Sequence, residues 1–246
     1  MLCLVTYVIL GLTEPVELVY RAIIRMLPTA PAVRSVVLDF ERATWVATRK
    51  VLPTVSIRGC AFHWGQAVWR KCQKLGLQVA YSKQDNVHRF IRQLMALPYL
   101  PKEHIPAAFQ KLKSRIQPNN RMYRLLTYIQ RRWIDSTIFP ISAWTVFGQP
   151  IRTNNDVEGW HNRLNRKAKG ASLHLYVMLK VLSDEARYLP MQIQLVSEHK
   201  LTRYQRAATK RSQSKLMELW DSYRSQQLTV SQLMSSVALI VVSSID

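Results

Sequence analysis

The sequence predicts an α/β fold that is mostly helical. Over about the first eighty residues, short apolar runs typical of buried strands alternate with longer segments typical of helices. After Tyr81 the strand-like runs stop, and apolar residues recur at the spacing of one helix face. We therefore expect a small parallel sheet near the start of the chain, followed by a largely helical remainder.

Three strands are expected in the α/β part, because three apolar runs there end at turn-forming or polar residues. They cover residues 3–10, 35–39 and 55–57. Helices are expected after each of them, at 14–27, about 40–50 and about 62–75.

The helical part opens with two amphipathic patterns. Apolar residues follow the i, i+3, i+4, i+7 spacing in Val87, Phe90, Ile91, Leu94 and Met95, and again from Met122 to Trp133. Further helices are expected at 156–169, 172–189 and about 198–224. The apolar tail at 237–242 is compatible with a terminal strand or with a frayed end.

A chain of 246 residues is long enough for one packed domain that carries an insertion. The patterns divide it into four segments. These are an α/β core segment at 1–80, a helical insertion at 81–150, core helices at 151–190, and a basic helical C-terminal extension at 191–246.

The charge balance points to a polyanionic partner. Lysine and arginine number 35 against 15 acidic residues, a formal net charge of +20, which is typical of proteins that bind nucleic acid. Two stretches, 104–134 and 200–215, contain many bases and no acid. Solvated helix faces explain some of these bases but not the missing acids. We expect DNA as the partner, self-association as a second interaction, and no small-molecule substrate.

Composition excludes several other classes of protein. A hydrophobic content of 48% excludes wholesale disorder. The apolar runs at the two ends are too short to span a bilayer, and the first lacks the flanks of a secretory signal, so no membrane partner is expected. Three cysteines without disulfide-like spacing favour a reducing, intracellular compartment.

Two acidic residues stand where a metal ligand is expected. Asp39 ends an apolar strand, and open parallel sheets place their ligand sites at such strand ends. Glu158 lies in the first turn of an expected helix, within a segment rich in asparagine that runs into several bases. Either acid could instead cap or stabilise the start of its helix.

A Cys-x2-His pair, Cys60 and His63, opens another expected helix. A thiolate and an imidazole at this spacing supply half of a zinc site, but no second local pair completes it. A structural role for a partly buried cysteine and histidine is the alternative.

Three of these segments together resemble the transposase domain of Mutator-like elements, the MULE domain. They are SVVLDFERA at 35–43, GCAFHWGQA at 59–67 and TNNDVEGWH at 153–161. Their order and intervals match, and the resemblance covers roughly residues 3 to 190. It implies a partial ribonuclease-H-like core interrupted by a helical insertion, DNA transposition as the activity, and a nuclear location.

The resemblance also implies a catalytic site. Asp39 would be the second and Glu158 the third of three acids that hold two Mg²⁺ or Mn²⁺ ions for DNA cleavage and strand transfer, and Cys60 and His63 match the Cys-x2-His signature of the family. The first acid of the family pattern precedes the first segment of this chain. We therefore expect a catalytic-core fragment without strand-transfer activity.

Two alternatives keep the bases but not the chemistry. One is a non-catalytic nucleic-acid-binding protein derived from a transposon, and the other is a basic helical scaffold that binds RNA. In all three cases the bases that follow Glu158 are the first candidates for phosphate contacts. The candidates are Arg163, Arg166, Lys167 and Lys169, followed by Arg131 and Arg132.

Overall fold

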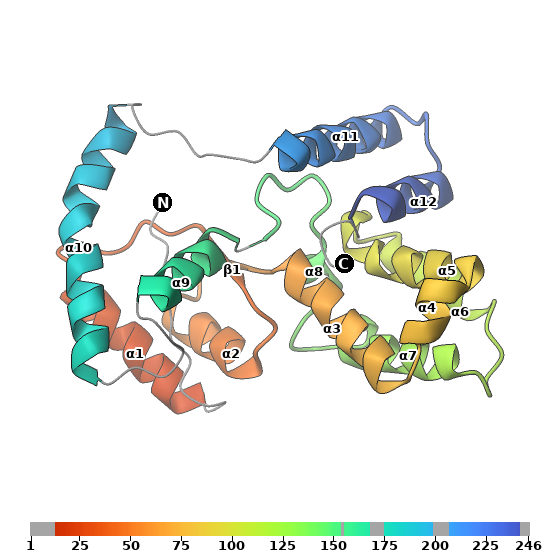
Figure 1. Ribbon diagram of the computed structural model, residues 1–246, viewed down its shortest axis with the longest axis horizontal. Coiled ribbons are helices and arrows are strands. Elements are labelled where there is room, and N and C mark those ends of the chain that lie inside the picture. Colours follow the sequence, from red (N-terminus) through yellow and green to blue (C-terminus); the bar gives the residue numbers. More distant parts are fainter. Residues whose placement is uncertain (1–12, 154, 168–174, 199–206, 242–246) are drawn as a thin grey trace. The chain divides into compact units, whose positions relative to one another are not determined.

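The computed structural model describes residues 13–153, 155–167, 175–198 and 207–241 (Figure 1). The chain forms two compact units, one of residues 1–153 with 212–246 and one of residues 154–211. We call them the first and the second unit and describe each by itself.

The first unit is mostly helical and carries the only two strands among the described residues. Its elements are α1 (Thr13–Met26), β1 (Ser35–Leu38), α2 (Arg42–Val51), β2 (Ser56–Gly59), α3 (Ala61–Lys74), α4 (Gln78–Lys83), α5 (Asp85–Met95), η1 (Leu97–Tyr99), α6 (Ile105–Lys113), α7 (Arg121–Ile129), η2 (Gln130–Ile134), α8 (Ile141–Trp144), most of α11 (Ala207–Arg224) and α12 (Val230–Val241). The second unit contains α9 (Asn155–Lys167), α10 (Leu175–Ser197) and the start of α11. This confirms a mostly helical α/β fold.

The two strands pair in parallel, as expected from the strand and helix order. The register aligns Ser35 with Ser56 and Leu38 with Gly59. Both strands fall within two residues of the ranges predicted for them, and α2 connects them. The strand expected at residues 3–10 lies outside the described residues.

A core rich in tryptophan fills the first unit. Trp45, Trp64, Trp133, Trp144 and Phe139 are almost completely buried, and they come from α2, α3, η2, α8 and the loop before α8. The apolar faces predicted for α5 and α7 also point into this core, where Ile91, Leu94, Leu125, Leu126 and Ile129 are fully buried. Helix periodicity therefore predicted the buried faces of these two helices correctly.

The end of the chain differs from both sequence-based expectations. Residues 230–241 form helix α12, and its Leu233, Met234 and Val237 are buried against the core. Figure 1 shows α12 beside α5, with which it makes direct contact. The apolar tail is neither a strand nor a frayed end because a helical register lets its apolar residues pack on one side.

Hydrogen bonds from side chains join both C-terminal helices to the core. The Nε of Arg92 donates to the carbonyl of Ala238 at 2.8 Å, which holds α12 on α5. The indole of Trp220 in α11 donates to the carbonyl of Tyr99 at 3.0 Å. Within the described ranges, no helix has both the length and the apolar character needed to cross a lipid bilayer.

Candidate metal centre and nucleic-acid interface

Parallel pairing brings Asp39 and Cys60 to the same edge of the sheet. Each residue directly follows the last residue of its strand, and those last residues, Leu38 and Gly59, are aligned in the register. The backbone N–H of Cys60 donates to the carbonyl of Leu38 at 2.9 Å and extends the ladder by one bond. The indole of Trp45 donates to the carbonyl of Asp39 at 2.7 Å. The backbone on both sides of the site is thus fixed.

Because Gly59 has no side chain, the end of β2 can lie directly against the ring of Phe40. A Cβ atom built at Gly59 would overlap the ring of Phe40, which follows Asp39 in the chain. The Phe40 ring is held in turn by edge contacts with Trp133 and Phe139, with centroids 4.5 and 5.4 Å away. The aromatic core therefore positions the strand end that carries Asp39.

His63 completes a cluster of three potential metal ligands with Asp39 and Cys60. It lies in the first turn of α3, and its Nδ1 is 2.9 Å from Oδ1 of Asp39. One ligand atom from each of the three residues lies within 4.8 Å of the other two. In the part of the chain that the structure describes, this is the one such group of three. Cys60 is fully buried, His63 is half-buried and Asp39 is exposed.

The surroundings of His63 favour its protonated form. Burial lowers the pKa of His63, but the hydrogen bonds to Asp39 and Cys60, together with coulombic interactions with both groups, outweigh burial and raise the pKa to about 10. At neutral pH, without a metal ion, His63 is therefore an imidazolium between Asp39 and Cys60.

Two other roles for these residues do not fit the geometry. Asp39 does not cap α2, because the N-cap residue is Glu41 and the Asp39 carboxylate instead meets His63. A nucleophilic role for Cys60, with His63 as base and Asp39 as orienting acid, requires access to the sulfur atom. Cys60 has 0% exposure, and buried structural cysteines are inert.

The donors around Asp39 do not fit the Mg²⁺ or Mn²⁺ ions that the family resemblance implies. Mg²⁺ takes oxygen ligands in near-ideal octahedral geometry, and Mn²⁺ also prefers oxygen. Here the carboxylate of Asp39 shares its position with the Cys60 sulfur and the His63 ring. The predicted third acid, Glu158, lies in α9, and its side chain is outside the described residues. Pairing of Asp39 with Glu158 in a two-metal site stays a prediction.

A second feature of the first unit is a hollow of about 450 Å³ lined by bases. Its lining residues are Lys71 of α3 and Arg124, Thr127, Tyr128, Arg131 and Arg132 of α7 and η2. The five from α7 and η2 follow the i, i+3, i+4, i+7, i+8 spacing of one helix face. The π-helical turn η2, a feature frequent at functional sites, carries the last two bases.

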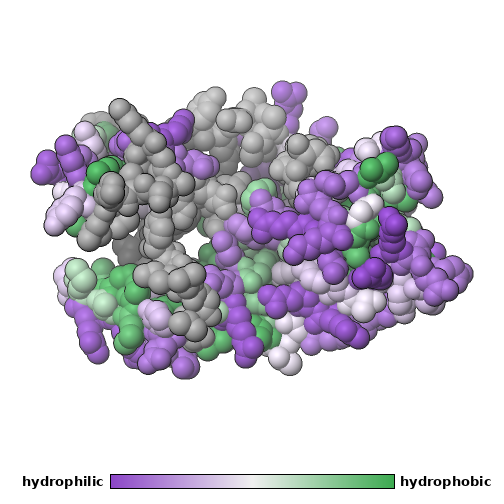
Figure 2. All heavy atoms as spheres, turned by 60° about the horizontal axis from the view of Figure 1, so that its bottom comes forward, coloured by the Kyte–Doolittle hydropathy of each residue, from purple (hydrophilic) through white to green (hydrophobic). Residues whose placement is uncertain are grey.

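The bases of this hollow are not neutralised by acids. The ion pairs found among the described residues include none of Lys71, Arg124, Arg131 and Arg132. Lys71 and Arg132 instead lie over aromatic rings, with the Nζ of Lys71 at 5.4 Å from the ring centroid of Tyr128 and Cζ of Arg132 at 5.1 Å from that of Phe139. Figure 2 shows hydrophilic side chains over much of the coloured part of the molecular face that it presents. The hollow therefore offers four positive charges to an anion.

The described bases among those predicted for DNA contact lie in both units. Arg131 and Arg132, the weaker candidates, line the basic hollow. Arg163 and Lys167, the stronger ones, both pair with Glu185 of α10 inside the second unit, Arg163 at 2.9 Å. Arg166 is exposed, and Lys169 lies outside the described residues.

Sequence reasoning missed Lys71 and Arg124 as members of the hollow. The spacing of Arg124 seven residues before Arg131 was a usable signal for a shared helix face. No local pattern links Lys71 to that face, because α3 and α7 meet only in the folded chain.

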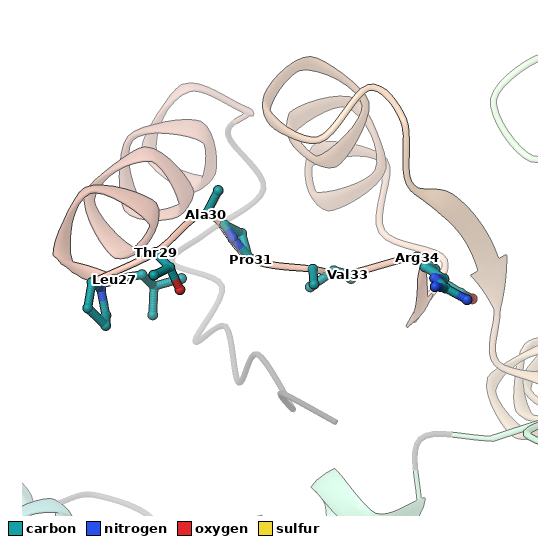
Figure 3. Close-up of a pocket in the computed structure, with 9 residues that line it drawn as sticks. Leu27, Thr29, Ala30, Pro31, Val33 and Arg34 are labelled. Atoms are coloured by element: carbon teal, nitrogen blue, oxygen red, sulfur yellow. The ribbon is translucent and has the colours of Figure 1, made fainter.

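A larger hollow, of about 540 Å³, has no chemistry of this kind. Its lining is the connection between α1 and β1, residues 27–35. In Figure 3 the labelled side chains lie along an extended stretch of chain and do not converge, and Arg34 is the only ionisable residue of this lining. We therefore assign no site to it.

The chain was compared with protein-family models, with curated proteins and with solved structures, and none of them matched.

Proposed function

We propose that this protein is a nucleic-acid-binding, Mutator-like transposase core that contacts the phosphate backbone through the basic hollow of α3, α7 and η2. The observation that carries the proposal is the set of four bases around this hollow that form no ion pair with an acid among the described residues. Duplex DNA presents closely spaced phosphates, so clustered bases release its condensed counterions and gain affinity.

The chemistry of the lining suits a phosphate group. The guanidinium groups of Arg124, Arg131 and Arg132 can form paired hydrogen bonds to phosphate oxygens, and Lys71 can add a point charge. The Tyr128 hydroxyl adds a neutral donor, whereas the Thr127 hydroxyl already donates to the carbonyl of Tyr123 at 2.9 Å. Contacts of this kind fix the protein on the backbone and read no sequence, so we expect non-specific binding.

The β1–β2 sheet supports the fold expected for the proposed family but not its catalytic activity. A parallel β1–β2 pair connected by a helix, with an aspartate at the carboxyl end of the first strand, is a pattern compatible with part of a ribonuclease-H-like core. The donors around Asp39 give no support for two-metal strand transfer. We therefore propose nucleic-acid binding, and not cleavage, as the function of the chain.

Binding of random-sequence duplex DNA at several salt concentrations tests the proposal. The double variant Arg124→Gln/Arg131→Gln should bind more weakly, and the slope of log affinity against log salt should fall by about two units, since each lost phosphate contact contributes about 0.9. The matched control Arg25→Gln/Lys83→Gln removes two exposed bases of α1 and α4. It loses the same charge and should change the slope much less.

Two results would contradict the proposal. An unchanged slope in the Arg124/Arg131 variant would place the binding surface elsewhere, and equal effects in both double variants would mean that only net charge matters. Competition between duplex DNA and structured RNA of equal length addresses the RNA-scaffold alternative. Stronger binding to RNA would favour that alternative.

A further inference from the structure

We propose that Asp39, Cys60 and His63 form a zinc site with three protein ligands and one open position. The sequence offered only a Cys-x2-His pair, which is half of a zinc site. Folding supplies the third ligand from the end of the neighbouring strand. This inference does not depend on nucleic-acid binding.

The donor types select zinc over harder ions. Thiolate and imidazole are the preferred ligands of Zn²⁺, and a carboxylate oxygen is accepted beside them. Three protein ligands with a water molecule in the fourth position is the usual arrangement of zinc sites that are open to solvent. The exposed side of Asp39 gives a path by which an ion can enter.

The distances between the three donor atoms need only small changes to match those around a zinc ion. Ligand atoms around a tetrahedral zinc ion lie roughly 3.3–3.8 Å apart, as follows from bond lengths of about 2.0–2.3 Å. His63 Nδ1 and Asp39 Oδ1 are now 2.9 Å apart. All three donors lie within 4.8 Å of one another. Shifts of about 1 Å therefore bring the three donors to zinc-binding distances.

The backbone around the donors is rigid enough to hold such a site. Cys60 and Asp39 are fixed by the hydrogen bonds to Leu38 and from Trp45, and His63 stands in the first turn of α3. Binding releases protons to the buffer, since a zinc-bound cysteine is a thiolate and a zinc-bound histidine is neutral. The ion would then tie the start of α3 to the end of β1.

Cobalt titration of the purified full chain tests the site, because Co²⁺ reports a cysteine ligand by a charge-transfer band in the near ultraviolet. The chain offers a matched control: Cys72 is also buried, lies in α3, which directly follows Cys60, and is not part of the cluster. Both variants are made in a Cys3→Ser background, which should show the band at one ion per chain. Cys72→Ser should keep the band, and Cys60→Ser should lose it.

Asp39→Asn provides a second variant in case Cys60→Ser does not fold. The Asp39 side chain is half exposed at 51%, so the exchange leaves the core unchanged. Near-ultraviolet circular dichroism of the metal-free variants checks the tryptophan core. The affinity for Zn²⁺, measured with a competing chelator, should fall by more than about tenfold, the effect seen when even a supporting residue of a zinc site is changed.

Several outcomes would overturn the inference. They are the absence of a band in the Cys3→Ser background, a band that survives in Cys60→Ser, an unchanged zinc affinity in Asp39→Asn, and displacement of zinc by an equal concentration of Mg²⁺. DNA binding is measured separately, so a failure of the zinc site and a failure of the proposed function are distinguishable.

Discussion

Nδ1 of His63, in the first turn of α3, lies 2.9 Å from Oδ1 of Asp39, at the end of β1. This contact joins two sequence motifs, the apolar strand that ends in an aspartate and the Cys-x2-His pair. Each motif alone can also be explained by an ordinary structural role. Together they place a carboxylate, a thiol and an imidazole at one edge of the sheet.

The first prediction concerns the pH dependence of stability in metal-free protein. The folded-state pKa of His63, about 10, is above the ordinary value of 6.5, so its pairing stabilises the fold fully below about pH 6.5. That stabilisation is lost as the pH rises through about 10. We expect the difference in unfolding free energy between the wild type and His63→Gln to shrink over this range.

Urea unfolding in the presence of a chelator, at steps from pH 6 to pH 10, measures this difference. The variant serves as the control for all other titrating groups, because only the His63 contribution differs. A difference that stays constant or grows with pH would contradict the assigned pairing.

The second prediction concerns Gly59. Gly59→Ala should destabilise the protein by about 1–3 kcal/mol, because the new methyl group would force the Phe40 ring out of the aromatic core. Gly159→Ala is the control, since a Cβ there meets no atom within 4 Å. Gly159 is inside helix α9, where alanine is favoured by roughly 0.5–1 kcal/mol. Chemical denaturation of both variants should therefore give opposite signs.

The third prediction concerns the C-terminal helix. Leu233 is 0% exposed, whereas Leu239 in the same helix is 74% exposed. Leu233→Ala should cost about 2–5 kcal/mol of stability through lost burial and a cavity. Leu239→Ala should stay within about 0.5 kcal/mol of the wild type. Equal effects, read from thermal or urea unfolding, would show that α12 does not belong to the core.

The fourth prediction concerns Glu185, which pairs with both Arg163 and Lys167. These two bases hold the pKa of Glu185 below its usual value, first Lys167 and then Arg163 through hydrogen bonds. Glu185→Gln frees both bases for phosphate contacts. DNA affinity should rise, and the salt dependence should steepen by up to about two units.

Asp184→Asn is the control for this experiment, because it removes the same charge one residue away, where the partner is Arg187. Anisotropy titrations at several salt concentrations compare the two variants. A similar gain in DNA affinity in both variants would mean that the change in net charge alone explains the effect. No gain in Glu185→Gln would exclude Arg163 and Lys167 from the DNA interface.

The sequence by itself determined the local features of this protein. Apolar spacing predicted the buried faces of α5 and α7, because a helix repeats its faces every three to four residues whatever surrounds it. Short apolar runs predicted β1 and β2 in the same way. The candidates Asp39, Cys60 and His63 were also visible, since their residue types and their places at element ends are local properties.

Only the tertiary structure decided which of these features meet. The alignment of Leu38 with Gly59 brings Asp39 onto His63, and that alignment depends on ladder hydrogen bonds and on the Phe40 ring over Gly59. The packing of α3 on α7 adds Lys71 to the bases of α7 and η2 in the same way. The structure of the apolar tail was also decided there. The sequence left a strand and a frayed end open, whereas the contact with α5 accompanies a helix, α12. A periodic pattern reflects the geometry of a single helix or strand. Contacts between segments depend on packing and register, which produce no repeat in the sequence.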